Sequence, residues 1–303
     1  MPVSRRQFIV LSSIAVGSVP FARLRAWQTA SAPAARFETI RRNVGWFGAK
    51  GGTIGWLVHP DAVVVVDTQY ADTAKLCLAG LAEKSSRGVD LLFNTHHHAD
   101  HTGGNGVFRS TTKKIVAHAR VPELQKQAAN PNQPAPVVAD ATFDKVWSEE
   151  SGDERITARY YGPAHTGGDS IVHFERANVS HMGDLLFHEM HPFVDRGAGA
   201  SIQNWITVLE TVVKDLPAGT VFIAGHAKPG LPVIHDRKAL QRQRDYFDAV
   251  LTHVRKGISA GSSKEEVAKT EALSGFDGYH SLPPRLTLSS VLGVAYDELT
   301  SKR

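Results

Sequence analysis

Cysteine is nearly absent from this sequence. Cys77 is the single cysteine in 303 residues, so the chain cannot form an internal disulfide in any compartment. Cys77 shares helical spacing with Ala74 and Leu81. This spacing predicts a buried and unreactive thiol, with a reactive thiol as the alternative.

Net charge is also small outside the first 32 residues. Those residues contain Arg5, Arg6, Arg23 and Arg25 and no acidic residue. Without these four, 30 of the 34 basic residues remain, which equals the 30 acidic residues of the chain. Because a chain without net positive charge attracts neither nucleic acid nor anionic lipid, we expect neither as a partner.

Apolar runs that could span a bilayer are missing too, since a span needs about 20 consecutive apolar residues. One shorter run, residues 9–19, follows Arg5 and Arg6 and precedes small residues around 30–35. This order resembles a twin-arginine export signal, and an ordinary N-terminal helix or membrane anchor is the alternative.

That resemblance implies that residues 1–32 address the chain to the twin-arginine export machinery, with cleavage between residues 28 and 35. This route carries folded proteins. We therefore expect a periplasmic or otherwise exported protein that is not stably inserted in the membrane once its signal is removed.

Strand and helix patterns are mixed along the rest of the chain. Alternating or continuous apolar runs predict strands at residues 37–43, 53–58, 62–67, 89–94, 156–161, 170–174, 178–182 and 220–224. Helical spacing predicts helices at 71–85, 202–216 and 289–299, within an almost wholly helical chain from 233 onward, and breaker residues predict loops at 48–52 and 130–136. Since no linker or repeat separates these elements, we expect one domain over residues 33–232 with a helical C-terminal extension over 233–303 packed on it.

The densest group of chemically active side chains directly follows the predicted strand at 89–94. The sequence reads THHHADHTGG over residues 95–104. In an extended chain alternate residues point the same way, so His96 and His98 can hold one metal ion. Asp100 and His101, where the chain bends, can hold a second ion, and His97 should point away. A loose surface cluster of histidines is the alternative.

Three further residues of ligand type stand at strand ends or in glycine-rich turns. His165 lies in PAHTGGD over residues 163–169, Asp184 follows Gly183, and His226 follows Gly225. A loose surface cluster does not explain these separate occurrences. We therefore predict that the distant turns converge on one metal centre.

Together these motifs resemble the metallo-β-lactamase superfamily over about residues 37–230. The resemblance implies an α/β fold, a four-layer αββα sandwich with the metal ions at one edge. Carried over by position, it implies a first metal held by His96, His98 and His165, a second held by Asp100, His101 and His226, and a bridge through Asp184. The stretch GDLLF over residues 183–187 is similar to glyoxalase II, whereas many class B β-lactamases have cysteine or serine at this aspartate.

Imidazole and carboxylate ligands suit zinc, so we expect two Zn²⁺ per chain, although a site without thiolate also accepts iron or manganese. Two neighbouring cations would lower the pKa of a shared water and hold it as hydroxide against a carbonyl carbon. No serine or cysteine nucleophile is then needed. Asp100 is the candidate catalytic residue because its carboxylate could orient this nucleophile or carry its proton.

Asp67 ends a predicted strand and is a candidate to support the metal ligands. We expect it to hydrogen-bond a ligand histidine and fix its tautomer. The alternative is that it caps the turn before the helix at residue 71.

Four residues are candidate substrate contacts. Trp46 and Phe47 could form an aromatic flap in a glycine-rich hairpin, although core packing or an exposed turn fits them equally. His191, near the candidate bridging aspartate, and Lys228, just after His226, could contact the substrate. A structural histidine and a solvated lysine are the alternatives.

These features predict an exported dinuclear metal hydrolase that cleaves a small ester, thioester, lactone or β-lactam-like amide. The bridging aspartate favours glyoxalase-like or lactonase-like substrates, whereas export favours a class B β-lactamase proper. Relatives with similar ligands hold iron, so an iron-dependent oxidoreductase like the sulfur dioxygenases is the alternative from another class. The neutral charge disfavours a nuclease, and a non-catalytic metal-binding protein would retain metal yet hydrolyse nothing.

Overall fold

Two β-sheets face each other in the computed structural model, which describes residues 35–301. The predicted export signal at residues 1–32 lies outside this range. The first sheet has its strands in chain order: β1 (Arg36–Arg41), β2 (Val44–Gly48), β3 (Ile54–His59), β4 (Ala62–Val66), β5 (Val89–Asn94), β6 (Thr112–His118) and β7 (Ala141–Phe143).

The second sheet has a different order, in which neighbours in space are not always neighbours in sequence. Its strands run β15 (Ile234–His235), β13 (Val221–Ile223), β11 (Val179–His181), β10 (Ser170–Phe174), β9 (Glu154–Tyr160) and β8 (Val146–Ser151). A separate short ladder pairs β12 (Phe187–His188) with β14 (His226–Ala227).

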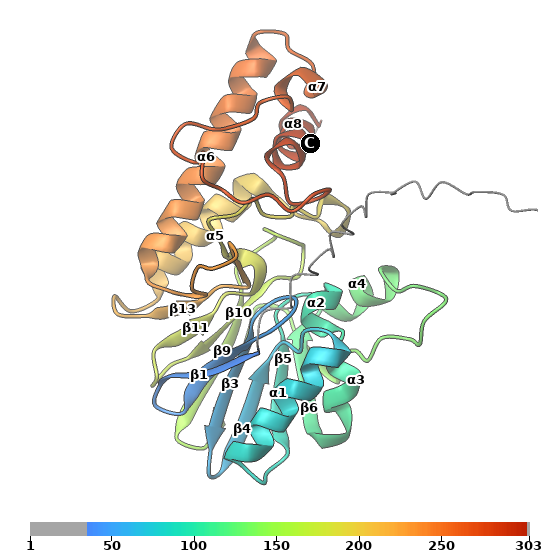
Figure 1. Cartoon of the computed structure of the whole chain (residues 1–303), viewed down its shortest axis with the longest axis vertical. Coiled ribbons are helices and arrows are strands. Elements are labelled where there is room, and N and C mark those ends of the chain that lie inside the picture. The colour runs from blue at the N-terminus through green and yellow to red at the C-terminus, as the bar shows by residue number, and fades with distance from the viewer. Residues whose placement is uncertain (1–34, 302–303) are drawn as a thin grey trace, which may run out of the picture. The chain divides into compact units, whose positions relative to one another are not determined.

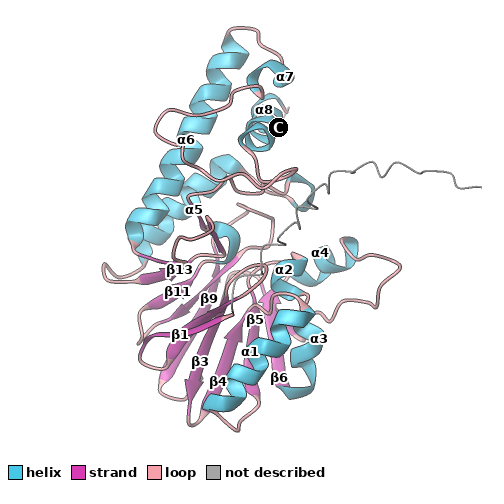
Figure 2. Cartoon of the chain, viewed as in Figure 1, coloured by secondary structure: helices cyan, strands magenta, loops and turns pink. Residues whose placement is uncertain are grey.

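Helices cover the outer faces of both sheets (Figures 1 and 2). The helices that precede the second sheet in sequence are α1 (Ala71–Lys84), α2 (Ala99–Thr102), α3 (Asn105–Phe108) and α4 (Val121–Gln127). Helix α5 (Ile202–Asp215) lies between β12 and β13 in sequence, and α6 (Arg237–Ser259), α7 (Lys264–Val267) and α8 (Leu288–Thr300) follow β15. Short 3-10 turns are η1 (Arg109–Thr111), η2 (Gly183–Leu185) and η3 (Arg196–Ala198). Within the described residues, no helix is both long and apolar enough to cross a membrane.

Strand β4 shows why the layers form. Its valines are all buried, and successive side chains in a strand point to opposite faces. Val64 and Val66 therefore pack between the two sheets, whereas Val63 and Val65 pack toward α1. A continuous apolar run is typical of a strand covered on both faces. The predicted αββα arrangement is confirmed.

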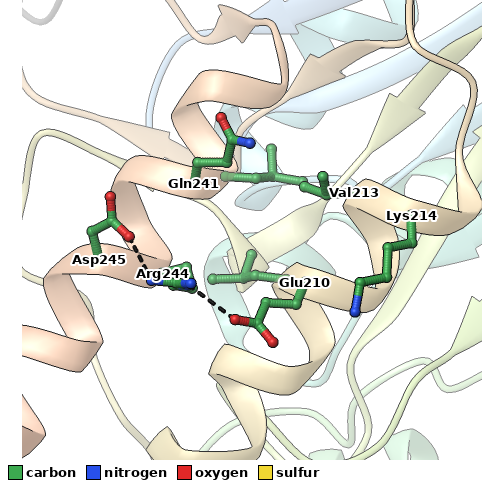
Figure 3. Close-up of a pocket in the computed structure, with 8 residues that line it drawn as sticks. Glu210, Val213, Lys214, Gln241, Arg244 and Asp245 are labelled. Carbon is green, nitrogen blue, oxygen red and sulfur yellow. Dashed lines mark hydrogen bonds and ion pairs between the residues drawn. The ribbon is translucent and has the colours of Figure 1, made fainter.

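The second helical layer is held by α5 and α6. Trp205 of α5 contacts Phe247 of α6, with ring centroids 4.6 Å apart, and both belong to one core with Phe222 of β13. On the solvent side the two helices leave a hollow of about 480 Å³, where Arg244 pairs with Glu210 at 3.0 Å (Figure 3). The predicted ligand residues lie elsewhere.

Several parts of the chain differ from the sequence-based prediction. Strand β2 covers residues 44–48, between the predicted strands at 37–43 and 53–58, and strands β6, β7 and β8 were not predicted. Residues 268–287, all within the described part of the chain, form turns and isolated bridges instead of helix. Pro283 and Pro284 interrupt helical hydrogen bonding there, and Gly275 adopts a positive φ.

Candidate metal centre

The predicted ligand residues come together where loops from both sheets meet. His96 and His98 follow β5, Asp100 and His101 belong to α2, His165 lies between β9 and β10, Asp184 lies in η2, and His226 begins β14. Their ligand atoms form two groups that could each hold a metal ion: His96, His98, His165 and Asp184, and separately Asp100, His101 and His226. Within each group these atoms lie within 4.8 Å of one another.

In the first group, three ring nitrogens face one another. His98 Nδ1 lies 3.1 Å from His96 Nε2 and 3.0 Å from His165 Nε2. Asp184 Oδ2 lies 3.8 Å from His96 Nε2 and 3.4 Å from His165 Nε2. A tetrahedral zinc ion with bonds of about 2.0 Å keeps its ligand atoms roughly 3.3 Å apart. The observed spacing is therefore close enough for these residues to share one metal ion.

The second group uses the other oxygen of Asp184. Asp184 Oδ1 lies 2.9 Å from His101 Nε2 and 3.3 Å from His226 Nε2. Asp100 Oδ2 lies 3.1 Å from His226 Nε2, and the two histidine nitrogens are 3.4 Å apart. Asp184 thus turns one oxygen toward each group, which is the arrangement that a bridging carboxylate needs.

Asp67 orients two of these histidines from the end of β4. Its φ is +65°, which turns the chain, and its Oδ2 accepts hydrogen bonds from His101 Nδ1 at 2.8 Å and from Thr95 Oγ at 2.7 Å. Thr95 Oγ lies 3.0 Å from His96 Nδ1 and can accept a hydrogen bond from it. Both rings then leave the Nε2 lone pair directed into the centre. The N-cap position of α1 is Tyr70, and the Asp67 carboxylate bonds Thr95 and His101 instead of that helix.

A second carboxylate, which the sequence-based prediction missed, orients His98, and the loop that carries it orients His165. His98 Nε2 donates to Asp195 Oδ2 at 3.0 Å, so this ring presents Nδ1 to the centre. His165 Nδ1 donates to the Phe193 carbonyl at 2.8 Å, and Asp195 N donates to the His165 carbonyl at 3.1 Å. An acidic residue in a glycine-containing turn was the only sequence signal for Asp195.

His97 stands outside the two ligand groups. Its Nε2 lies 3.7 Å from Asp195 Oδ2, and His97, His98 and Asp195 form a third cluster of ligand-type residues. The His98 nitrogen in that cluster is the one already hydrogen-bonded to Asp195. We therefore interpret this cluster as support for the first group.

Glycines allow the ligands to approach the backbone. A Cβ atom at Gly52 would lie 2.1 Å from His101 Cε1, and one at Gly225 would lie 2.2 Å from Asp184 Oδ1. Either separation is far below van der Waals contact, so any side chain at these positions would displace a ligand residue. The glycines next to the predicted ligands are required by this close packing.

Burial and charge distinguish the two groups of histidines. Burial lowers the pKa of His165 to about 3 and also lowers the pKa of His96, which favours the neutral imidazole that binds metals. Burial also opposes charge on His226, but Asp184 and Asp100 raise its pKa to about 9. The carboxylates thus attract positive charge, which divalent cations can supply in place of protons. The donor set, the facing lone pairs and this charge balance fit two cations.

Trp46 and Phe47 do not form an exposed flap. Both lie in β2 and are 7% and 2% exposed, respectively. Trp46 packs between the sheets and Phe47 packs toward the helices, because adjacent strand residues point to opposite faces. Core packing, the alternative interpretation, describes both residues.

His191 and Lys228 are engaged by the C-terminal part of the chain. His191 is buried, and its Nδ1 lies 2.7 Å from the hydroxyl of Tyr246 in α6. Lys228 Nζ donates to the Gly278 carbonyl at 2.9 Å. These contacts give both side chains a structural partner and do not involve the ligand residues.

Comparison with known proteins identifies a family model and several relatives that match this chain. The model of the Metallo-beta-lactamase superfamily matches residues 48–226. A hydroxyacylglutathione hydrolase of Maricaulis maris is 28% identical over 141 residues, which cover 44% of this chain and 47% of that protein. The chain therefore spans about half the length of this relative. A metallo-beta-lactamase type 2 of Bacillus cereus is 24% identical over 195 residues, 63% of this chain and 73% of that protein.

A solved structure with a similar fold is the stereoselective inverting sec-alkylsulfatase Pisa1 from Pseudomonas sp. It has a TM-score of 0.66 and 15% sequence identity, and the match covers 88% of this chain and 50% of that chain. At this identity the likeness shows the fold alone.

Proposed function

Because this chain belongs to the metallo-β-lactamase superfamily, we propose that it is a metal-dependent hydrolase with two divalent cations, zinc first among them. Its substrate is a small ester, thioester, lactone or β-lactam-like amide. The observation that carries the proposal is that the two oxygens of Asp184 face two separate groups of ligand atoms. The names of the relatives as hydrolases support it.

The ligand atoms divide between the two ions as follows. His96, His98, His165 and Oδ2 of Asp184 would hold one ion, and Asp100, His101, His226 and Oδ1 of Asp184 would hold the other. Two divalent cations bound there supply Lewis acidity that makes water nucleophilic near neutral pH and polarises a scissile carbonyl. The other contributions come from the protein.

Asp100 is the carboxylate placed to move a proton. Its side chain is 23% exposed, whereas that of Asp184 is 4% exposed, so Asp100 is the one open to water and substrate. Burial opposes its ionisation, but His101 and His226 lower its pKa. Its Oδ2 faces the second ligand group, so the other oxygen, Oδ1, can accept a proton from the attacking water and pass it to the leaving group. Asp184 stays buried and positions the two ligand groups.

The residue at the bridging position indicates which substrates of this class to expect first. An aspartate at position 184 and the match to a hydroxyacylglutathione hydrolase favour a thioester or lactone over a β-lactam. The match to a type 2 metallo-beta-lactamase keeps β-lactams in the panel.

We also propose the remaining organisation of the chain. Residues 33–232 form the catalytic domain, and residues 233–303 form a helical extension on the same domain. A core shared by α5, α6 and α8 supports this organisation. Export by the twin-arginine route rests on the resemblance of residues 1–32. Replacement of Arg5 and Arg6 by lysine should keep the protein in the cytoplasm, and unchanged export would contradict the route.

Metal analysis followed by a substrate panel tests the activity. Purified protein should contain about two zinc ions per chain, lose activity on chelation and regain it with added zinc. Nitrocefin, an acyl-homoserine lactone and an acyl thioester form the panel. His96→Ala should lose metal and activity, and His253→Ala, in α6 and outside the ligand groups, is the control that should retain both. Stoichiometric iron with oxygen consumption would overturn the hydrolase proposal, as would full zinc content without cleavage of any panel member.

A further inference from the structure

A cleft of about 700 Å³ adjoins the candidate centre on the side of His98. Residues of α2, α3 and α4 form one wall, the loop at 128–137 forms another, and Arg285 reaches the cleft from the segment between α7 and α8. Much of the lining is small and apolar: Ala71, Ala128, Ala129, Pro134, Pro136 and Val137. Such a lining can hold an acyl chain by burying its surface.

Arg285 is the one permanently charged residue among those that line the cleft, and no carboxylate lines it. Its guanidinium lies 5.4 Å from the centre of the Phe193 ring, and that ring lies 5.4 Å from the ring of His98. One aromatic ring therefore separates the guanidinium from a ligand histidine. Within the described residues Arg285 has this aromatic neighbour and no ion-pair partner, so the cation is available to a ligand.

We propose that this cleft binds the apolar part of an anionic acyl substrate, whose negatively charged group pairs with Arg285 while its scissile carbonyl lies at the metal centre. The inference rests on the proposed hydrolase function and narrows its substrate class to esters, thioesters or lactones whose acyl part carries a negative charge. A guanidinium beside apolar walls selects by charge as well as by chain length.

A pair of esters that differ only in charge tests the role of Arg285. The monoester of glutaric acid with 4-nitrophenol has an anionic acyl chain, and 4-nitrophenyl pentanoate has a neutral chain of the same length. Arg285→Gln should lower kcat/KM for the anionic ester about tenfold, mainly through KM, and leave the neutral ester within about twofold. Arg255→Gln, an exposed arginine of α6, is the matched control and should change neither. An equal loss for both esters, or no loss, would overturn the proposal.

Direct binding separates this inference from the proposed activity. Calorimetry with octanesulfonate, an unreactive amphiphilic anion, should show binding that Arg285→Gln weakens about tenfold and Arg255→Gln does not. If that result holds but neither these esters nor any member of the substrate panel is cleaved, the hydrolase proposal fails and the cleft assignment stands. If esters are cleaved and Arg285→Gln binds octanesulfonate like the parent, the cleft assignment fails alone.

Gly106 offers a test of the apolar part. A Cβ atom built there meets only Val137 Cγ2, at 3.9 Å. Since Gly106 and Val137 both line the cleft, we expect the side chain of Gly106→Leu to enter it. We expect it to weaken octanesulfonate binding at least about fivefold and to leave hydrolysis of 4-nitrophenyl acetate unchanged. Thermal unfolding verifies that the variant is folded. Unchanged octanesulfonate binding by the folded variant would show that the chain does not occupy the cleft.

Discussion

Two carboxylates hold the ligand histidines in place, and they differ in how far water can reach them. The side chain of Asp67 is fully buried at the end of β4, whereas that of Asp195 is 21% exposed in a loop. Asp67 accepts hydrogen bonds from Thr95 N, Thr95 Oγ and His101 Nδ1. Asp195 accepts from His98 and from the backbone of Ala198. Water can replace a lost partner at an exposed position but not at a buried one, so the two carboxylates should differ in importance.

The supporting elements differ in the same way. Strand β4 is paired on both sides, by β3 and β5, so Asp67 is fixed by the centre of a sheet. Asp195 belongs to a turn that ends in η3. Asp67 is therefore held by the pairing of strands on both sides, whereas Asp195 is held by hydrogen bonds within its own loop.

Removal of Asp184 should have the largest effect, because this residue belongs to both halves. Asp184→Ala deletes one ligand atom from each group and should reduce zinc from about two ions to at most one, with a loss in kcat/KM of about 1000-fold or more. Metal analysis and steady-state kinetics measure both changes. Asp248→Ala, at an exposed position of α6, should retain metal and activity. Two tightly held ions in Asp184→Ala would contradict the bridge.

Asp67→Asn should have the next largest effect. The amide keeps the shape of the side chain but loses the charge and brings an N–H donor among groups that donate to Asp67. We expect zinc affinity at the second group to fall about 100-fold and the free energy of unfolding to fall by about 2 kcal/mol, since a buried hydrogen bond is lost. Competition with a chromophoric chelator and urea unfolding measure the two quantities. Unchanged zinc affinity would remove the supporting role of Asp67.

Asp195→Asn should have a smaller effect, because water can reach this side chain. We expect zinc affinity at the first group to fall about tenfold and the free energy of unfolding to change by less than about 1 kcal/mol. The same chelator competition measures it. If Asp195→Asn loses as much affinity as Asp67→Asn, burial does not rank the two carboxylates.

The sequence predicts the residues of this centre well when they follow a strand and poorly when they lie in a long loop. Asp67 and His96 directly follow apolar strands, and the period of a buried strand locates their position in the sheet. Asp195 follows no periodic pattern, and its partner His98 lies 97 residues away in sequence. Its role depends on tertiary packing that local patterns do not contain.

Glycine explains the error at β2. The predicted strands stop at residue 43 and resume at residue 53, so the stretch VGWFG of β2 lies outside them, and glycine usually weakens a strand. In the structure a Cβ atom at Gly45 would lie 2.1 Å from the ring of Trp56, so the glycine makes room for an aromatic ring from β3. The opposite error occurs at residues 268–287. The chain from residue 233 onward was expected to be almost wholly helical, but prolines and glycines prevent a helix in this segment.

His191 lies outside the centre and offers a contrast with the histidines that Asp67 and Asp195 support. Its hydrogen-bond partner is the phenol of Tyr246 and not a carboxylate. Burial lowers the pKa of His191 to about 4, with a smaller contribution from His280. Since the unfolded chain has the ordinary pKa near 6.5 and binds more protons, the stability from neutral His191 is present above pH 6.5 and is lost as the pH falls toward 4. His101, which faces Asp67, should respond in the opposite direction, because its neighbouring carboxylates raise its pKa against burial.

Urea unfolding of the chelator-treated protein at pH 7, 6 and 5 measures this difference. The parent should lose about 1 to 2 kcal/mol more than His191→Gln between pH 7 and pH 5, because glutamine can accept the hydrogen bond from the Tyr246 hydroxyl but does not titrate. Ligand histidines titrate equally in both proteins, so the difference isolates His191. Identical pH slopes would show that burial beside a phenol does not hold this ring neutral, and the contrast with the carboxylate-supported histidines would then lose its physical basis.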